Sequence, residues 1–403
     1  MFLGRITVKD QQVFDGRKRR CLGLLAADGR AGNITSCAPE ARRAHPLFRQ
    51  VALDFAAFDQ TGITLKMVEQ AYCTHATRSF RLQVIDGNVY IVGETPPFLD
   101  WHRQVKLQIL EVAMEWDLPD LDLVITSTDT VPANQSAILS DACPDQGPVL
   151  ATSKRDADMH AVLYPDSSFG DWPDTFTPGW KHIRYLLEKS AAQHPWEQRQ
   201  GKLFFRGAST GNRGILAENK SLIRSPMDIR ILDWAARPAA DHVSLVEHCR
   251  YKYLLHMPGN FFSARLRYLL MCNSTVIFPD PGWYEFWYQI LEDDKHFIKV
   301  DAVDETNRGN HLRRVVEQLE GNQELAKAIA RQGMELIQTT LTPEAVKSYW
   351  LMVFAKYASL QRFQPTLHPD VMSLGLSLTK PNPTIDYEAR TCQVCPRTRG
   401  KDP

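Results

Sequence analysis

The chain has 403 residues, and its 47 Lys and Arg balance its 47 Asp and Glu, so the formal net charge is zero. This balance excludes partners held by bulk electrostatics, such as a nucleic-acid backbone or an anionic membrane surface. The composition, 44% hydrophobic and 23% charged, is that of a globular protein. The length allows two domains, each with its own core. No apolar run in the sequence is long enough to span a bilayer.

The first half of the chain is expected to form an irregular arm over 1–45 and an α/β domain over 46–185. An apolar stripe at helical spacing opens this domain, over Phe48, Val51, Phe55 and Phe58. Alternating residues on both sides of Asp86-Gly87 predict a β-hairpin, because that dipeptide favours a two-residue turn. An amphipathic helix over 105–116 and a short apolar strand over 121–125 follow.

The second half is expected to form a Rossmann-type domain over 186–345, a closing helix over 346–365 and a disordered tail over 366–403. Short buried-type strands alternate with helices there, which is typical of a parallel sheet covered on both faces. These strands are predicted over 203–205, 250–257, 275–278 and 296–300. Thr342-Pro343 predicts the start of the last helix, with an N-cap followed by proline at the first helical position. The fold class is therefore α/β.

The strand over 203–205 runs into Arg206-Gly207 and then into a loop of small residues that ends at Arg213. Small residues let a ligand approach the backbone, and Arg206, Thr210 and Arg213 offer donors suited to phosphate oxygens. Ligands of α/β sheets bind beyond the carboxyl ends of the strands, where this loop is expected to lie. A glycine-rich surface loop with solvated arginines is the alternative interpretation.

The strand over 250–257 leads through Pro258-Gly259 to a helix that is expected over 263–272. Ser263 is placed to cap that helix, and Arg265 falls in its first turn. The backbone N–H groups at the helix start, the helix dipole and the arginine together predict an anion site. A purely structural strand-to-helix turn is the alternative.

Asp129 follows the strand over 121–125, within Thr126-Ser-Thr-Asp-Thr-Val-Pro132, and is expected to project into the cleft between the domains. Transfer of a group to an alcohol needs a base, because a neutral hydroxyl is a poor nucleophile and its proton must leave. A carboxylate at the carboxyl end of a strand suits that task. A turn-forming aspartate is the alternative.

Aromatic residues surround Glu285 in the segment Trp283-Tyr-Glu-Phe-Trp-Tyr288. Rings that stack on a sugar or a base, beside a carboxylate that holds paired hydroxyls, are typical of a sugar or nucleoside site. An aromatic cluster that packs the domain core is the alternative.

Two patterns that suggest a metal are set aside. Cys392-Gln-Val-Cys395 has the spacing of metal ligands, but a zinc site needs a second ligand pair and none lies nearby in the sequence. The pairs Asp120-Leu-Asp122 and Asp156-Ala-Asp158 arise easily by chance among 47 acidic residues. We therefore expect neither a metal nor another cofactor.

Several of these segments, taken together and in this order, resemble one family. The likeness runs from about Pro46 to Gln364 and is strongest over 203–300. It rests on Phe-Phe-Arg-Gly at 204–207, the strand that starts at Cys249, Ser263-Ala-Arg265, the segment 283–288, Ala-Lys-Ala-Ile-Ala-Arg-Gln-Gly at 326–333 and Tyr349-Trp350. On these motifs the chain resembles glycosyltransferase family 90, which holds the Rumi-type protein O-glucosyltransferases and the fungal capsule-associated proteins.

The resemblance implies a GT-B-like fold, with two Rossmann-type domains facing a cleft and a C-terminal helix that closes onto the first. It implies inverting, metal-independent transfer of glucose or xylose from a UDP donor to a protein serine or a glycan. Asp129 falls on the position of the catalytic base, and Arg213 and Arg265 fall on the diphosphate-binding arginines. The other expected donor-binding residues are Arg206, Ala208, Thr210, Asn260, Phe261, Phe262, Ser263, Ala264 and Glu285.

Departures from the family pattern leave alternatives open. Thr126 stands where the family usually has asparagine, an extra residue precedes Pro132, and Ala208 stands where a serine is frequent. The sugar therefore stays undecided. A catalytically inactive relative that binds nucleotide or glycan is the alternative function.

A disulfide between Cys249 and Cys272 is also expected. A strand that starts at Cys249 and a helix that ends at Cys272, joined by a tight turn, bring both ends to one side of the sheet. The resemblance pairs the same two positions, and two buried, reduced cysteines are the alternative. A bridge requires an oxidising compartment, here the lumen of the endoplasmic reticulum or Golgi. Residues 1–20 lack the apolar segment of a signal peptide, which we attribute to a truncated or misassigned N-terminus.

Overall fold

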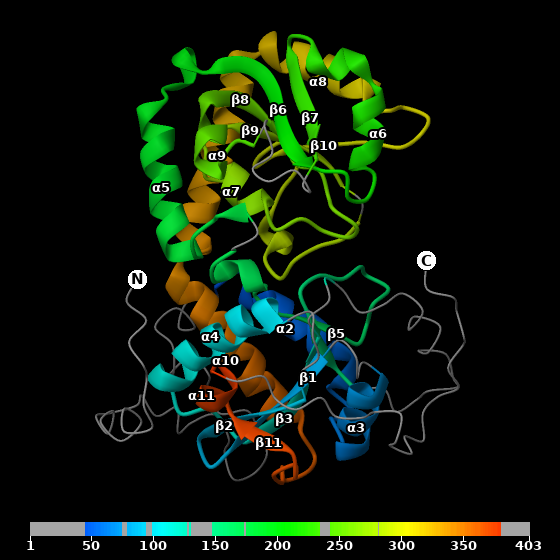
Figure 1. The fold of residues 1–403 in the computed structure, drawn as a ribbon, viewed down its shortest axis with the longest axis vertical. Coiled ribbons are helices and arrows are strands. Elements are labelled where there is room, and N and C mark those ends of the chain that lie inside the picture. The colour runs from blue at the N-terminus through cyan, green and yellow to red at the C-terminus, as the bar shows by residue number, and fades with distance from the viewer. Residues whose placement is uncertain are drawn as a thin grey trace.

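The computed structural model describes residues 45–74, 79–93, 99–126, 129, 147–172, 175–233, 242–280 and 282–379. Two bodies are stacked along the long axis of the molecule, and each is built around one β-sheet (Figure 1). The predicted arm lies outside the described residues, apart from His45. None of the helices in the described ranges is long and apolar enough to cross a bilayer.

The first body contains a six-stranded sheet in the order β11-β2-β1-β3-β4-β5. Its strands are β1 (Ser79–Ile85), β2 (Asn88–Val92), β3 (Leu121–Thr126), β4 (Val149–Ala151), β5 (Ala161–Leu163) and β11 (Val371–Ser373). The predicted hairpin is confirmed, because β1 and β2 pair antiparallel. Its turn residues Asp86 and Gly87 have φ of 51° and 71°, the left-handed values that a type I′ turn requires.

This first sheet is mixed rather than all parallel, which corrects the expectation of a Rossmann-type domain here. β11, β2, β1 and β3 pair antiparallel, whereas β3, β4 and β5 pair parallel. The physical reason is the tight turn at Asp86-Gly87, because a two-residue connection can join only antiparallel strands. Only the part of the sheet from β3 to β5 has the parallel arrangement of a nucleotide-binding fold.

The start of the predicted disordered tail is ordered, so that expectation is wrong for residues 366–379. β11 pairs with the edge strand β2, with Val371 opposite Val92. The hydroxyl of Ser373 then accepts a hydrogen bond from the Leu376 N–H, which starts the short helix α11 (Leu374–Ser377). The open edge of β2 supplies the backbone partners that this short segment lacks by itself. Residues 380–403 lie outside the described part of the chain.

The second body contains a five-stranded sheet, all parallel, in the order β10-β9-β8-β6-β7. Its strands are β6 (Gln200–Ala208), β7 (Met227–Leu232), β8 (Tyr251–Leu255), β9 (Thr275–Pro279) and β10 (Ile298–Val300). Successive side chains of β6 enter different cores: Leu203 and Phe205 pack in one apolar cluster and Phe204 in the other. Both faces of the sheet are therefore buried, as predicted for this region.

Helices cover both faces of the second sheet: α5 (Trp180–Gln193), α6 (Arg213–Glu218), α7 (Leu266–Leu270), α8 (Asn310–Glu320) and α9 (Gln323–Thr340). α5 is continuous across residue 185 and lies alongside this sheet (Figure 1). The second body therefore begins near Trp180 rather than at residue 186. A helix cannot be divided there, because Ile183 and Leu187 belong to the same apolar core.

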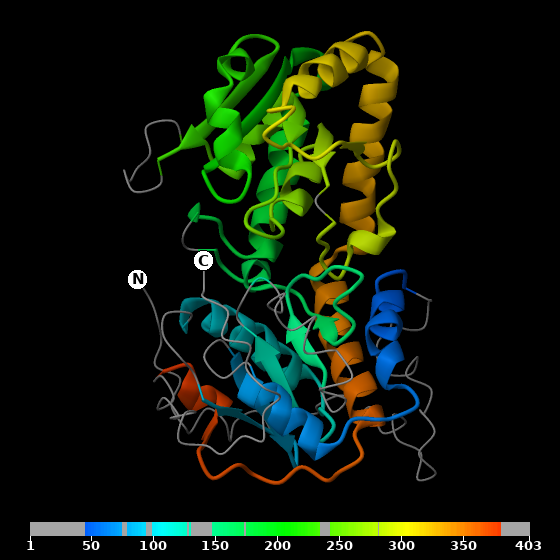
Figure 2. The same cartoon turned by 90° about the vertical axis from the view of Figure 1, so that its right-hand side faces the viewer.

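The last long helix, α10 (Pro343–Leu360), returns to the first body and packs against α2 (Phe48–Phe55) and α4 (Leu99–Glu115) (Figure 2). The Thr342 hydroxyl accepts a hydrogen bond from the Ala345 N–H at 3.1 Å, so the predicted N-cap is confirmed. Tyr357 donates its hydroxyl to the carbonyl of Asp122 at 2.7 Å. This helix ties the end of the second body to the sheet of the first.

A disulfide joins Cys249 to Cys272, with the two Cα atoms 4.6 Å apart. Cys249 lies in the 3-10 helix over Leu245–Arg250, just before β8, and Cys272 follows α7, so the bridge links two neighbouring segments of the second body. Arg199 donates a hydrogen bond to the carbonyl of Cys272 at 2.8 Å. Cys73, in helix α3 (Leu65–Thr74) of the first body, is also disulfide-bonded.

Candidate active site

One cavity of about 540 Å³ lies between the two bodies and gathers most of the predicted site residues. The first body contributes Asp129, Thr152 and Asp166 to its lining. The second body contributes Arg206, Ala208, Thr210, Arg213, Asn260, Phe262, Ser263, Ala264 and Arg265. The predicted base and the predicted phosphate-binding loops therefore face one space, although they come from different sheets.

Asp129 follows β3 and is held in place through its backbone. Its carbonyl accepts hydrogen bonds from the hydroxyls of Thr152, at 2.7 Å, and Ser153, at 2.5 Å. Both hydroxyls come directly after β4, the strand beside β3. The Asp129 side chain is partly exposed, towards the cavity. Burial, and secondarily the charge of Asp166, raise the pKa of Asp129 to about 6.

A carboxyl with this pKa can serve as a base at neutral pH. It is mostly ionised there, and it holds a proton more tightly than an ordinary aspartate, whose pKa is about 3.9. Basicity of this kind is what proton abstraction from a hydroxyl requires. The arrangement thus supplies a positioned carboxylate with raised proton affinity at the wall of the cavity.

Arg206, at the end of β6, lines the cavity with its charge already balanced. Its guanidinium forms an ion pair with Asp228 at 2.9 Å and donates to the Asp228 carbonyl at 2.8 Å. It also lies over the ring of Phe204, 4.4 Å from the ring centroid. Because Asp228 compensates its charge, Arg206 adds less positive potential to the cavity than its position in the loop suggested.

Arg213 and Arg265 are different, because no carboxylate in the described ranges forms an ion pair with either of them. Arg213 donates to the Met257 carbonyl at 2.8 Å and to the Thr210 hydroxyl at 3.0 Å. Arg265 donates to the Arg206 carbonyl at 2.5 Å. Burial and the neighbouring charge of Arg265 lower the pKa of Arg213, and burial lowers the pKa of Arg265 to about 10.

Two uncompensated guanidinium groups in one cavity are unfavourable without an anion between them. Burying an unpaired charge costs free energy, and these two charges also repel each other. An anionic group in the cavity would relieve both costs through charge-assisted hydrogen bonds. The physical character of this end of the cavity is therefore that of an anion site.

Two glycines bring the anion-binding loops together. A side chain at Gly207 would place its Cβ 2.7 Å from Nη2 of Arg265. At Gly211, where φ is 55°, a Cβ would come within 2.1 Å of the Gly259 carbonyl. The Gly211 N–H also donates to the Asn260 side chain at 3.0 Å. The small residues after β6 thus allow close approach of the second loop rather than of the ligand alone.

The helix expected over 263–272 is shorter than predicted, which changes the origin of the anion site. α7 begins at Leu266 and has five residues, so Ser263 is not its N-cap. The Ser263 hydroxyl instead accepts a hydrogen bond from Arg213 at 3.3 Å. The Gly259 N–H bonds to the Phe262 carbonyl at 2.9 Å, and this local turn delays the helix. Guanidinium groups, and not a helix terminus, make the site positive.

Phe261 and Glu285 do not line this cavity, in contrast to expectation. The Phe261 ring packs edge-on against Trp283, with the ring centroids 5.1 Å apart. Glu285 is fully buried and lies 3.4 Å from Arg267 in an ion pair. A carboxylate with no exposed surface, committed to a buried guanidinium, cannot hold the hydroxyls of a ligand in this cavity.

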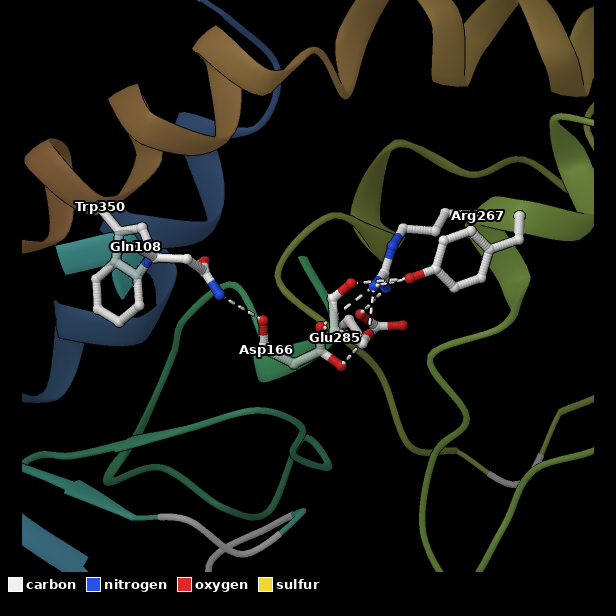
Figure 3. A network of polar contacts seen from close by, with 7 residues as sticks. Gln108, Asp166, Arg267, Glu285 and Trp350 are labelled. Carbon is white, nitrogen blue, oxygen red and sulfur yellow. Dashed lines mark hydrogen bonds and ion pairs between the residues drawn. The ribbon is translucent and has the colours of Figure 1, made fainter. Parts of the chain in front are cut away.

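Glu285 belongs to a polar network that joins the two bodies (Figure 3). Arg267 reaches Asp166 of the first body at 3.3 Å. The carbonyl of Asp166 accepts from Gln108, whose side-chain oxygen accepts from Trp350 of α10. The sequence interpretation did not identify Asp166 or Arg267 as site residues. The available signals were the place of Asp166 just after a buried strand and the position of Arg267 two residues after Arg265.

The acidic pairs that were set aside as metal ligands have other partners. Asp122 is fully buried and forms a two-pronged contact with Arg81, with both distances at 2.5 Å. Asp158 accepts from the Arg155 N–H at 2.8 Å and stabilises a turn. In the ranges that the structure describes, no group of three His, Cys, Asp or Glu side chains is arranged to hold a metal ion.

The sequence as a whole matches the model of one family, Glycosyl transferase family 90, over residues 40–386. The chain therefore belongs to glycosyltransferase family 90. Among curated relatives, it is 28% identical to the O-glucosyltransferase rumi of Drosophila melanogaster over 349 residues, which cover 80% of this chain and 79% of the relative. It is 29% identical to Protein O-glucosyltransferase 1 of Rattus norvegicus over 283 residues, 65% of this chain and 68% of that protein.

A solved structure, the glycosyltransferase of Rickettsia africae ESF-5, matches with a TM-score of 0.34 and 10% identity. The match covers 66% of this chain and 83% of the other. A likeness of this extent supports no argument about the fold or the site of this chain.

The raised pKa of Asp129 predicts a stabilising effect of removing its charge. The pKa of Asp129 in the folded chain, about 6, lies above the value of about 3.9 for an unfolded aspartate. Ionisation of Asp129 therefore opposes folding. The free energy of unfolding falls as the pH rises from about 4 to about 6. The D129N variant should therefore be more stable than wild type at pH 8 by about 1–2 kcal/mol, after allowance for solvent screening. Towards pH 4 the difference should vanish.

Urea unfolding at the two pH values measures this effect. Asp171→Asn is the matched control, because Asp171 is exposed and does not line the cavity. If the gain in stability of D129N over wild type is no larger at pH 8 than at pH 4, the Asp129 carboxyl is solvated like an ordinary surface group.

Proposed function

We propose that the chain is an inverting glycosyltransferase that moves glucose from UDP-glucose to a hydroxyl of a protein. The observation that carries the proposal is the lining of one cavity, which holds Asp129 together with Arg213 and Arg265, two arginines that form no ion pair with a carboxylate of the described ranges. Membership of family 90 supports glycosyl transfer as the reaction class. The names of the relatives, O-glucosyltransferase, favour glucose over xylose and a protein over a polysaccharide.

In the proposed reaction, the acceptor oxygen attacks the anomeric carbon of the donor while Asp129 takes the proton of the hydroxyl. A new bond forms between the acceptor oxygen and the anomeric carbon, and the bond from that carbon to the phosphate oxygen breaks. UDP leaves with the electron pair of that bond. Attack from the face opposite the leaving group inverts the anomeric centre, and the proton ends on Asp129.

Arg213 and Arg265 stabilise the leaving diphosphate in this proposal. Negative charge develops on the β-phosphate as the bond breaks, and donors already fixed near that position stabilise it without reorganisation. Both guanidinium groups are fixed by hydrogen bonds to backbone carbonyls. The positive field that a divalent metal supplies in other transferases would thus come from these side chains.

The fold suggests how the substrates divide between the two bodies. The loops after β6 and β8 lie at the carboxyl ends of parallel strands, where nucleotides bind in sheets of this kind. The donor is therefore assigned to the second body and the acceptor to the Asp129 side. Two bodies that face one cavity in this way constitute the GT-B-like arrangement that we propose.

We place the protein in an oxidising compartment, the lumen of the secretory pathway. The disulfide between Cys249 and Cys272 supports this placement, because such bridges persist where thiols are not kept reduced. Thiol labelling of the natural protein, with and without reductant, tests it. Labelling of both cysteines without reductant would contradict the placement.

Asp129→Asn should reduce transfer by at least about 100-fold, the usual scale for loss of a general base. UDP affinity should change little, because the substitution preserves volume and the diphosphate contacts lie on the other wall. In wild type, kcat/KM should fall as the pH drops through about 6, because the protonated carboxyl cannot accept a proton. Near wild-type turnover of a folded D129N variant would exclude Asp129 as the base.

Arg213→Ala and Arg265→Ala should each weaken UDP binding by roughly 1.5–3 kcal/mol, the range for a charge-assisted hydrogen bond. Binding of uridine, which has no phosphate, should change much less. Isothermal titration with the two ligands measures both. Arg313→Ala is a suitable control, because Arg313 is not among the residues that line the cavity and donates to the backbone carbonyls of Ser221, Arg224 and Ser225. Equal losses for UDP and uridine would assign the arginines a role in folding alone.

Transfer should persist in EDTA if the arginines supply the positive field. UDP release in the presence of acceptor, measured before and after chelation, is the test. Complete loss with EDTA and recovery with manganese or magnesium would refute the metal-independent mechanism. UDP release without transfer of the sugar to an acceptor would mean that the chain only hydrolyses the donor. If UDP-glucose binds but no UDP is released, the inactive, ligand-binding alternative is favoured.

A further inference from the structure

A second cavity, of about 800 Å³, lies at the junction of the two bodies. Among the residues that the structure describes, it shares no lining residue with the first cavity. The first body lines it with α2, through Leu53, and with the segment after β4, through Lys154 and Asp156, and the second body with residues of 278–299. Ligand sites favour such junctions and enclose about 300–1,000 Å³, so this cavity has the place and the size of a site for a small molecule.

Backbone pairing and a buried ion pair separate the two cavities. Lys154 and Tyr284 pair across the bodies through two backbone hydrogen bonds, with N···O distances of 3.1 Å and 3.0 Å. Thr152 lines the first cavity, whereas Lys154, two residues later, lines the second. Glu285, next to Tyr284, lines neither cavity and pairs with Arg267 (Figure 3). A ligand of the second cavity therefore binds apart from the proposed reaction site.

The aromatic segment that the sequence analysis assigned to a sugar or nucleoside site lines this second cavity. Trp283, Tyr284 and Tyr288 contribute to the lining, and each is partly exposed. Neighbours fix the Trp283 ring: the guanidinium carbon of Arg155 lies 4.7 Å from its centroid, and the Phe261 ring packs edge-on at 5.1 Å. The second cavity thus has aromatic rings in fixed positions along its wall.

Carboxylates are the other shared feature of this lining, and they come from both bodies: Asp156, Asp280 and Asp293. Two ion pairs balance the lysines of the lining, Lys154 with Asp54 at 2.5 Å and Lys299 with Asp280 at 2.9 Å. In the part of the chain that the structure describes, Asp156 and Asp293 form no ion pair. The lining therefore offers acceptors of hydrogen bonds and no unbalanced cation, which excludes a phosphate or a nucleotide as its ligand.

The arrangement of these acids distinguishes a hydroxyl-rich ligand from a cation. Within the described ranges, no three acidic, histidine or cysteine side chains are arranged to hold one metal ion. The three carboxylates are thus spread around the cavity and do not gather at one point. Acceptors that are spread in this way suit several hydroxyls of one molecule better than a single positive charge.

We propose that the second cavity binds a saccharide, a pyranose with the equatorial hydroxyls of glucose. The flat faces of such a ring consist of axial C–H bonds, which pack on the negative face of an aromatic ring. Its hydroxyls lie around the rim, where they can donate to carboxylates. Because Asp156 belongs to the first body and Trp283 to the second, a saccharide in this cavity contacts both bodies.

Saturation-transfer difference NMR on the full chain tests the inference without any need for turnover. The aromatic protons of the protein are saturated, and transfer to cellobiose, a disaccharide of glucose, is recorded. Transfer to the ring C–H protons of cellobiose is expected. Sorbitol, which has hydroxyls but no ring face, should receive much less. Nα-acetyl-lysine amide is the cationic probe, and transfer to it but not to cellobiose would overturn the inference.

Variants locate the bound sugar. Asp156→Asn keeps the volume and removes the charge of an exposed side chain, and it should raise the Kd for cellobiose by roughly 10-fold or more, the scale for a hydrogen bond to a charged group. Asp171→Asn, exposed and outside both cavities, is the matched control and should leave the Kd unchanged. Trp283→Ala should also weaken binding, whereas Trp172→Ala, in the lining of the first cavity, should not.

Three results would overturn the inference. The first is the absence of transfer from the folded wild-type chain to cellobiose. The second is equal transfer to sorbitol and cellobiose, because the rings would then contribute no stacking. The third is loss of binding in Trp172→Ala with unchanged binding in Asp156→Asn, because the sugar would then lie in the first cavity. If Trp283→Ala does not fold, Asp156→Asn, at an exposed position, still decides the location.

Discussion

The buried guanidinium of Arg267 constrains how the two bodies meet. It has no exposed surface, and such a charge is tolerated only with carboxylates and hydrogen bonds around it. One carboxylate, Glu285, comes from its own body and the other, Asp166, from the first body. The guanidinium also packs 3.9 Å from the ring centroid of Phe169. Separation of the bodies would leave the Arg267 guanidinium without the Asp166 carboxylate. The face-to-face arrangement of the two bodies around the cavity therefore depends on the ion pair between Arg267 and Asp166.

The segment 265–267 contributes to the charge distribution around the cavity. Arg265 and Arg267 lie two residues apart. Arg265 lines the cavity and forms no ion pair with a carboxylate in the part of the chain that the structure describes, whereas Arg267 pairs with Asp166 and Glu285. Burial, and secondarily the charge of Asp166, raise the pKa of Asp129, while the basic wall favours an anion. A base that holds protons firmly, opposite a site for a negatively charged leaving group, is the charge distribution that displacement of a diphosphate by a hydroxyl requires.

The sequence predicted features that depend on local chemistry. Asp86-Gly87 specified a turn, Thr342-Pro343 a helix start, and the apolar runs around Phe204 a buried parallel strand. It predicted the cavity arginines because they follow strands. It did not predict β11, because the partner of Val371 is Val92 on the edge of β2, 279 residues earlier in the chain. Nor did it predict the pairing of Asp166 with Arg267 across the bodies. Glu285 was misassigned because an acid among aromatic residues looks the same in a core as in a sugar site.

The central claim is that the diphosphate of a sugar nucleotide lies between Arg213 and Arg265, with the sugar towards Asp129. A crystal structure of the D129N variant with UDP-glucose tests it most directly. The account predicts phosphate oxygens within hydrogen-bonding distance of both guanidinium groups and the anomeric carbon on the side of residue 129. A nucleotide bound elsewhere, or with its diphosphate on the wall of Asp166, would contradict it.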